Sequence, residues 1–202
     1  MRKSWHVYLA LVVLVTVLAA AGCAVKSNTL NALLAAAKAL DDKDYKTFNK
    51  YVNVDRIVDQ CVTLLLEEAK AYTKKPRPKL WKLGEKFARP HLVEMTKEQF
   101  RRAVEDGTVA EQIEGLDKLP SSRLMFNLVG LFGVAHTDSS TYEIGEVTET
   151  KNGESLKLKV KYNGEWLPLE LRAKKVGDHY RIVEVENLHD VAGALLKDLQ
   201  DD

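Results

Sequence analysis

The chain has 202 residues, of which 46% are hydrophobic and 7% aromatic, and its 30 Lys and Arg nearly balance its 29 Asp and Glu. A protein that binds nucleic acid through phosphate contacts needs a clear basic surplus, and an acidic disordered chain needs the opposite, so both classes are excluded. Two cysteines are too few for a disulfide scaffold or a cysteine-built metal site, and we expect no cofactor.

A secretory leader is predicted at the start of the chain. Arg2 and Lys3 precede an uncharged run over residues 7–22, which reads VYLALVVLVTVLAAAG and ends in small residues directly before Cys23. A positive start, an apolar core and a small-residue end are the three parts of a signal peptide. We therefore predict a signal peptide over residues 1–22 and export of the rest.

The small residues followed by Cys23 resemble the lipobox of bacterial lipoproteins, although Ala20 stands where that family most often has Leu. The resemblance implies cleavage before Cys23, transfer of a diacylglycerol to its sulfur and acylation of its new amino group. Residues 23–28 then form a lipidated tether in the cell envelope, on a membrane that faces the periplasm or the cell exterior. Ala24 after the cysteine implies the outer membrane where the cell has one.

An uncleaved helix from about Trp5 to Val25 is the alternative for the same segment, because its length is close to the ~20 apolar residues that span a bilayer. In both cases the basic residues Arg2 and Lys3 stay on the cytoplasmic side and everything after Lys26 is exported. The predicted localisation is therefore the cell envelope under either alternative.

Residues 29–202 are predicted to form a single α+β domain that begins with helices. Apolar residues at helical spacing predict a first helix to about residue 40, capped by Ser27 or Asn28. A short second helix follows over about 45–52, and a third begins at Asn53 or Val54 and ends before Pro76.

The middle of the chain is expected to contain three more helices. Two are expected between residues 80 and 105, because Gly84 and Pro90 interrupt the pattern, and Gly107 ends the second. Ser121 or Ser122 is expected to cap the next, whose segment 124–132, LMFNLVGLF, is strongly apolar. This segment is either a buried central helix or one wall of a cavity for an acyl chain.

From residue 141 onward the hydrophobic period changes from 3.6 to 2, which predicts strands over 141–150, 154–162, 166–175 and 179–186. Tight turns are expected at Asn152-Gly153, Asn163-Gly164 and Gly177-Asp178, and Pro168 indicates a sheet edge or bulge. A last helix over 188–199 completes an α+β fold in which helices cover one face of an antiparallel meander.

The segment over residues 35–60 resembles the start of an uncharacterised family of bacterial exported domains, through Asp44, Phe48, Tyr51 and Val52. Asn53 departs from the Asp that is commoner in that family. The order of helices followed by a meander is also similar to the cone-shaped fold of nuclear transport factor 2-like proteins. In such folds the closing strand often carries an aromatic before an Ile-Val pair, as in the segment 180–183. Neither resemblance implies an activity.

Candidate catalytic and metal-binding residues are sparse. The histidines His91, His136, His179 and His189 never stand three or four positions apart, so their spacing is poor for a metal site. The pairs His136-Asp138 and His189-Asp190 are more typical of loops and helix caps than of a base with its orienting acid. Cys61 falls in the apolar stripe of its helix and is expected to be a buried core residue rather than a reactive thiol.

A basic stretch extends from residue 74 to residue 89, with Trp81 and Phe87 among its lysines and arginines. Two interpretations were weighed for it. One is a surface for anionic lipid headgroups; the other, preferred here, is a solvated helix face whose aromatic residues pack inward. The basic members are Lys74, Lys75, Arg77, Lys79, Lys82, Lys86 and Arg89.

The predicted function is that of a membrane-anchored lipoprotein whose domain is a non-catalytic binding or interaction module, with an envelope protein or a hydrophobic ligand as its partner. The alternative is a carrier of a hydrophobic ligand such as a phospholipid, held in a cone-shaped cavity. In that role the chain is similar to the toluene-tolerance family of periplasmic phospholipid carriers, which shares the layout of helices before a sheet. Cys23 is the one site residue that the sequence nominates, as the lipidation site.

Overall fold

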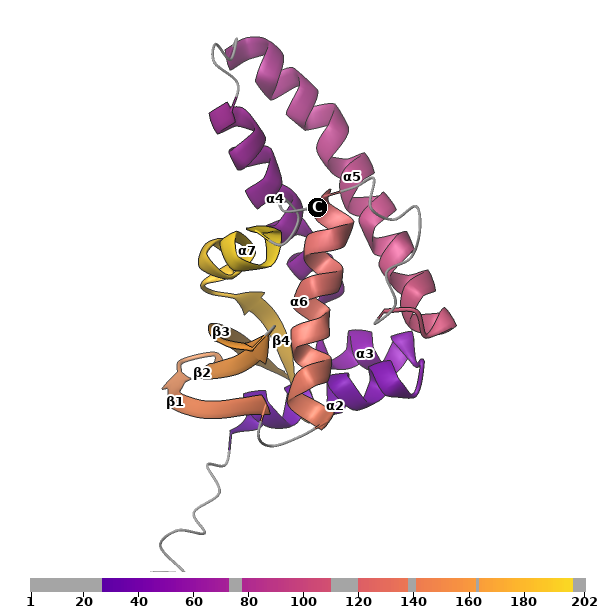
Figure 1. Ribbon diagram of the computed structural model, residues 1–202. Coiled ribbons are helices and arrows are strands. Elements are labelled where there is room, and N and C mark those ends of the chain that lie inside the picture. Colours follow the sequence, from indigo (N-terminus) through magenta and orange to yellow (C-terminus); the bar gives the residue numbers. More distant parts are fainter. Residues whose placement is uncertain (1–26, 73–77, 110–119, 138–140, 163, 198–202) are drawn as a thin grey trace, which may run out of the picture.

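The computed structural model describes residues 27–72, 78–109, 120–137, 141–162 and 164–197, and its architecture is α+β, as predicted (Figure 1). The predicted leader, Cys23 and the C-terminal acidic residues lie outside the described residues. The helices are α2 (Asn28–Asp41), α3 (Tyr45–Tyr51), α4 (Val54–Tyr72), α5 (Pro78–Asp106), α6 (Pro120–Thr137) and α7 (Leu188–Lys197). The strands are β1 (Tyr142–Thr150), β2 (Gly153–Tyr162), β3 (Glu165–Val176) and β4 (His179–Val185).

The first helices begin at side chains that accept hydrogen bonds from their free backbone N–H groups. Ser27 caps α2, since its hydroxyl accepts a bond of 3.0 Å from the Leu30 N–H, which confirms one of the two predicted caps. Asp44 does the same for α3 through the Thr47 N–H at 2.9 Å. The third predicted helix is α4, and Asn53 accepts from the Arg56 N–H at its start.

The expectation of two helices between residues 80 and 105 was wrong, because α5 is a single helix of 29 residues with Pro90 inside it. A proline leaves the carbonyl four residues earlier without its helical partner. Pro90 and Lys86 are both exposed, so water can hydrate that carbonyl and the helix continues. Gly107, with a φ of +75°, ends α5 as predicted.

The expected serine cap of the next helix was also wrong. Pro120 is the first residue of α6, a position that suits its fixed φ, and both serines lie within the first turn, where they are buried. The Ser121 hydroxyl lies 2.9 Å from that of Thr96, and the Ser122 hydroxyl donates to the Gln99 side chain. The serines therefore join α6 to α5 instead of capping α6.

The sheet is a meander in the order β1-β2-β3-β4, and every pair is antiparallel. Gly164 and Gly177 have φ of +86° and +62°, which confirms two of the three predicted turns at their glycines. The third turn lies one residue before its predicted position, at Lys151-Asn152, because Gly153 is the first residue of β2. A Cβ there would lie 1.9 Å from the Ala173 carbonyl oxygen, so close approach of β3 requires this glycine.

Pro168 lies at a sheet edge, as predicted. It is paired with Lys159 of β2, but the pairing between β3 and β4 begins only at Leu171. The side of β3 that faces β4 has no strand partner at Pro168, where the Asn187 side chain donates to the Pro168 carbonyl at 2.9 Å instead. A residue without an N–H therefore costs no ladder bond at this position. A shift in register at Arg172 marks a bulge in the β3–β4 pairing.

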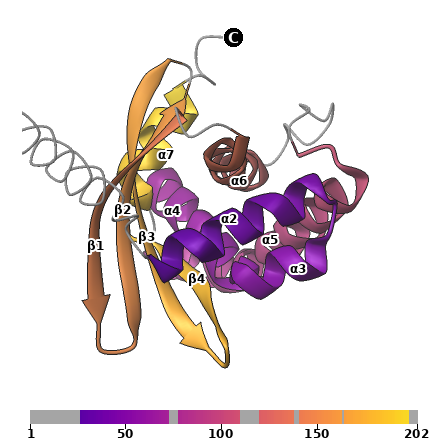
Figure 2. The same ribbon diagram turned by 90° about the horizontal axis from the view of Figure 1, so that it is seen from below.

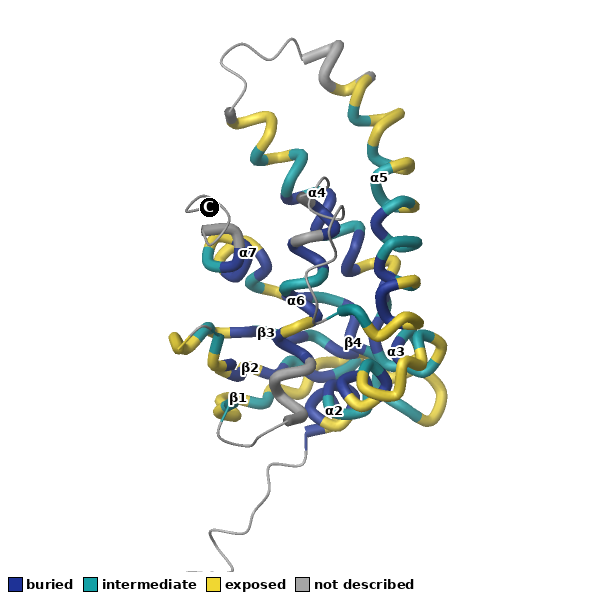
Figure 3. Tube along the Cα trace, turned by 45° about the vertical axis from the view of Figure 1, so that its right-hand side comes forward, coloured by how far each residue is buried: buried dark blue, intermediate teal, exposed yellow. Residues whose placement is uncertain are grey.

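Helices cover one face of the sheet, and the core lies between the two layers (Figure 2). Side chains from that face of β2 and β3 share one hydrophobic core with α2, α4, α6 and α7. The far ends of α4 and α5, residues 66–72 and 78–90, extend beyond this core and are here called the arm (Figure 1). Most of the arm's described residues are exposed or half-buried (Figure 3).

Candidate functional site

The described chain begins at a buried carboxylate that fixes the N-terminal end of α2 to the sheet. The Glu154 carboxylate accepts hydrogen bonds from the Ser27 hydroxyl, from the Asn28 N–H at 3.1 Å and from the Thr29 N–H at 2.9 Å. Glu154 is 3% exposed and Ser27 is 1% exposed. We call this set of contacts the α2 anchor. It satisfies backbone donors that the first turn of a helix leaves without partners.

The surroundings of Glu154 favour its ionised carboxylate. Burial raises the pKa of its carboxyl, but the hydrogen bonds from Ser27, Thr29 and Asn28 together outweigh this effect and hold the pKa below its ordinary value. The positive end of the α2 dipole favours the same ionised state. Glu154 therefore acts as an anionic acceptor at the point where the chain enters the folded body.

Sequence reasoning did not find Glu154, although a signal for it was present. Glu154 lies in phase with Leu156, Leu158 and Val160, which face the core, whereas the lysines between them face solvent. A carboxylate on the apolar face of a strand needs donors from another element. The identity of those donors was not predictable, because α2 lies more than 120 positions away.

Of the two cysteines, Cys61 lies among the described residues and Cys23 does not. Cys23, the predicted lipidation site, lies outside the described residues, four positions before the α2 anchor begins at Ser27. Cys61 is fully buried in the core, as predicted, and it is a free thiol. Burial raises the pKa of Cys61 to about 12, so the thiol is protonated at neutral pH and is a poor nucleophile.

The structure does not bring the histidines together into a site. The His179 Nε2 donates to the Lys50 carbonyl over 3.2 Å, and its Nδ1 lies 3.0 Å from the Asp178 carboxylate. The His179 ring packs edge-on against Tyr51. It thereby joins β4 to α3. The hydrogen bond from His179 lowers the pKa of Asp178. His189 is exposed on the first turn of α7, and the side chain of His136 is not among those described.

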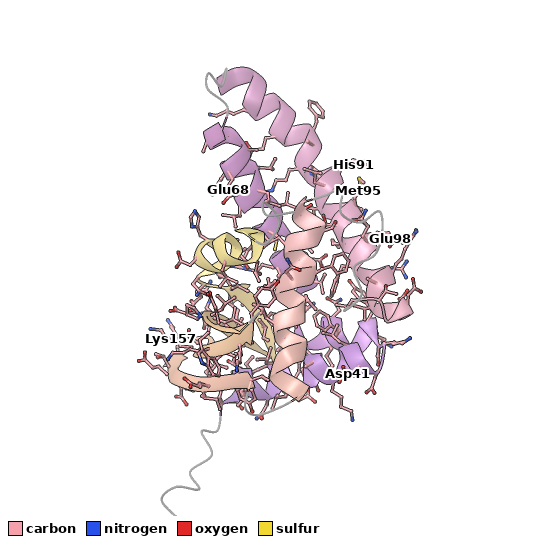
Figure 4. The ribbon with its side chains drawn as sticks, in the orientation of Figure 1. Asp41, Glu68, His91, Met95, Glu98 and Lys157 are labelled. Atoms are coloured by element: carbon pink, nitrogen blue, oxygen red, sulfur yellow. The ribbon has the colours of Figure 1, made fainter. Side chains whose placement is uncertain are left out.

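His91 lies along α5 with Met95 and Glu98, as Figure 4 shows. These residues line a shallow recess of about 370 Å³, together with others of the same helix. Glu98 accepts hydrogen bonds from Arg101 and Arg102, which lower its pKa to about 2. The carboxylate is thus engaged in ion pairs along the surface of α5, where such pairs support the helix.

The preferred interpretation of the basic stretch was wrong for Phe87, which is 71% exposed instead of packed inward. Lys82 and Lys86 are exposed, as a solvated face requires. Residues 74–77 and the side chains of Lys79 and Trp81 lie outside what is described. Arg89 contacts α4: its guanidinium donates to both carboxylate oxygens of Asp59 at 2.8 Å and to the Thr63 hydroxyl at 2.8 Å.

The apolar segment of α6 is a buried central helix, the first of its two interpretations. Its core side chains are fully buried and pack in the same cluster as those of α2, α4 and the sheet. The half-buried Asn127 donates to the Leu195 carbonyl of α7 at 3.4 Å. The buried members of the segment are Leu124, Met125, Leu128, Val129, Leu131 and Phe132.

Within the described ranges, no three His, Cys, Asp or Glu side chains are placed to hold a metal ion. None of the helices described is both long and apolar enough to cross a bilayer. Comparison of the chain with protein-family models, with curated proteins and with solved structures found no match. Its function therefore has to be inferred from its own residues.

Proposed function

We propose that the chain is a membrane-anchored lipoprotein of the cell envelope, and that its folded body is a non-catalytic interaction module. The observation that carries the proposal is the position of the α2 anchor. Ser27 is buried and hydrogen-bonded only four residues after Cys23, the lipidation site that the leader predicts. A lipid on Cys23 would thus be joined to the folded body by a very short segment of chain. Such a short connection is expected if Cys23 is the point of membrane attachment.

The roles of the polar side chains support an interaction module over an enzyme. Several of the polar contacts in this structure join one secondary-structure element to another. Glu154 joins β2 to α2, Arg89 joins α5 to α4, and Ser122 joins α6 to α5. Arg172 of β3 likewise pairs with Glu184 of β4. Such contacts hold a scaffold in one arrangement, which a binding surface requires.

The arm is the surface best suited to a protein partner in the envelope. It projects from the end of the body opposite to the start of α2 (Figure 1), so a lipid on Cys23 leaves it accessible. Phe87 is 71% exposed there, with the exposed Lys82 and Lys86 on the same helix. Exposed aromatic side chains such as Phe87 are of a kind that is enriched at protein interfaces, and the lysines beside it would favour a partner with acidic groups.

Core packing favours this module over the carrier of a hydrophobic ligand. A carrier needs an open apolar cavity of several hundred Å³ between the sheet and the helices. The inward side chains of the two central strands are instead 0–2% exposed and contact the helices that cover them. They are Leu156, Leu158 and Val160 of β2 and Leu169, Leu171 and Ala173 of β3.

Metabolic labelling with palmitate tests the anchor. Cells that produce the wild-type chain should incorporate label into it and retain it in the membrane fraction, whereas Cys23→Ala should do neither. Cys61→Ala is the matched control, because it removes the other cysteine and should leave the labelling unchanged. Label that persists in Cys23→Ala, or wild-type chain found free in the cytosol with its first methionine, would contradict the proposal.

Native mass spectrometry of the purified protein separates the module from the carrier. The module should show the mass of the acylated chain and nothing more. A co-purifying lipid in addition to the covalent one would favour the carrier instead, particularly if an apolar ligand added afterwards displaced it.

A further inference from the structure

A recess of about 530 Å³ lies beside the α2 anchor, where the β1–β2 and β3–β4 hairpins end. Glu149 to Glu154 line it from the β1–β2 hairpin, and Lys174, Lys175 and Tyr180 line it from β3 and β4. Glu154 belongs both to this recess and to the α2 anchor. The recess therefore lies next to the residue at which the described chain begins.

The recess is positively charged. Lys151, Lys174 and Lys175 are exposed, and none of the three forms an ion pair with another residue in the described parts of the chain. Two acidic residues, Glu149 and Glu154, also line it, but the Glu154 carboxylate is already hydrogen-bonded to the first turn of α2. Three ammonium groups around one cavity suit an anionic ligand.

Covalent geometry limits how far this recess can lie from a membrane that holds Cys23. Three residues lie between Cys23 and Ser27, so the chain advances four residues from one to the other and spans at most ~14 Å when extended. Ser27 itself is hydrogen-bonded to Glu154 in the wall of the recess. The recess thus lies at the level of lipid headgroups. Val176, which is 44% exposed at the adjoining β3–β4 turn, can enter the edge of the apolar layer.

We propose that this recess binds the anionic headgroup of a phospholipid in the membrane to which Cys23 is anchored, and so orients the body on that membrane. The inference rests on the proposed lipid anchor. The lysines supply the charge that recognises the phosphate, and Tyr180, half-buried against the core, supplies a phenol of the type that is enriched at membrane interfaces. The arm then points away from the membrane, toward its partner.

Acetylation of lysines by a water-soluble reagent tests the proposal on the full chain. The protein is purified from membranes and reconstituted into vesicles of phosphatidylcholine alone or of equal parts phosphatidylcholine and phosphatidylglycerol. We expect acetylation of Lys151, Lys174 and Lys175 to slow about five-fold or more in the anionic vesicles, the factor that ~1 kcal/mol per lysine near an anionic surface gives.

The matched internal control is the row of lysines on β2 that does not line the recess. Lys157, Lys159 and Lys161 are exposed and alternate with the core residues of β2, so they face away from the helices (Lys157 in Figure 4). Their acetylation should be equal in both vesicles. In addition, Lys175→Gln should weaken the protection of Lys151 and Lys174, whereas Lys161→Gln should not.

Four other outcomes would overturn the proposal, and each can be told from the rest. A Cys23 peptide without acyl chains in the mass spectrum overturns the anchor and the headgroup site together. Equal acetylation of the recess lysines in both vesicles, on a protein whose Cys23 is acylated, overturns the headgroup site alone. Equal slowing of all six lysines shows unspecific attraction, and protection by inorganic phosphate in neutral vesicles shows a site for a free anion instead.

Discussion

Ser27 and Glu154 lie 127 positions apart in the chain, yet the hydroxyl of the first donates to the carboxylate of the second in the buried wall between α2 and β2. The same hydroxyl accepts a bond from the Leu30 N–H. Ser27 therefore serves at once as the cap of a helix and as its attachment to the sheet. This contact is not predictable from the local sequence around either residue.

The effect of Glu154→Gln on the free energy of unfolding tests this contact. The amide matches the carboxylate in size, but its NH₂ group would face the N–H donors of α2, so we expect a loss of about 1–3 kcal/mol at neutral pH. Urea unfolding followed by circular dichroism measures it. Glu149→Gln is the matched control, because Glu149 is the exposed cross-strand neighbour of Glu154 and should be neutral within the error.

The same contact predicts that the stability of the fold depends on pH. The pKa of Glu154 is lower in the folded chain than its ordinary value of 4.5, so the carboxylate stabilises the fold fully above that value and loses its contribution as the pH falls through the folded pKa. The difference in stability between wild type and Glu154→Gln should therefore shrink on acidification below 4.5. A difference that stays constant or grows would contradict this assignment.

Truncation of the two phenylalanines of α5 should have very different effects on stability. Phe100 is fully buried and its ring centroid lies 5.4 Å from that of Phe48, so Phe100→Ala should cost about 3–5 kcal/mol. Phe87→Ala should change stability by less than about 0.5 kcal/mol, because Phe87 is exposed on the arm. Thermal and urea unfolding of both variants measure the contrast, and a large loss for Phe87→Ala would place that ring in a core.

Arg89 should control the order of the arm more than the stability of the body. Its bidentate contact with Asp59 is half-exposed, so Arg89→Ala should cost less than about 1 kcal/mol globally. Hydrogen exchange in residues 82–90 should nevertheless become faster, since this contact ties the arm half of α5 to α4. Arg102→Ala, which removes a pairing within α5 only, should leave exchange in the arm unchanged.

Cys61 should be unreactive in the folded protein. In Cys23→Ala it is the remaining cysteine, and burial raises its pKa to about 12, so almost no thiolate exists at mildly alkaline pH. An aromatic disulfide reagent should release its chromophore only after denaturant is added. Rapid release from the native chain would mean that α4 opens or that the thiol has access to solvent.

Local patterns predicted most of the fold. The alternation of Leu and Lys in β2 located the strands, and apolar spacing located α2, α3 and α4 within a few residues. The errors arose where solvent exposure or a neighbouring strand decides the local structure. Pro90 lies on an exposed part of α5, where solvent can hydrate the carbonyl that loses its helical partner, and Gly153 allows close approach of β3.

The candidate site was less predictable than the fold. Cys61 was assigned correctly to the core, because its position in an apolar stripe is a local property. The partners of Glu154 come from a distant helix, and the recess combines two hairpins, so neither is visible in any one segment. Phe87 was assigned inward because its helix was expected to lie on the body, whereas the arm extends beyond it.

The separation of Thr29 from Glu154 by 125 residues also dictates an order of assembly. In a polypeptide that crosses a membrane from its N-terminus, the donors of α2 arrive long before their acceptor. They remain hydrated until β2 has emerged, and under the proposed lipid anchor the acylated end is until then attached but free to rotate. Attachment and alignment are thus separate events in time, and the second waits for the last third of the polypeptide.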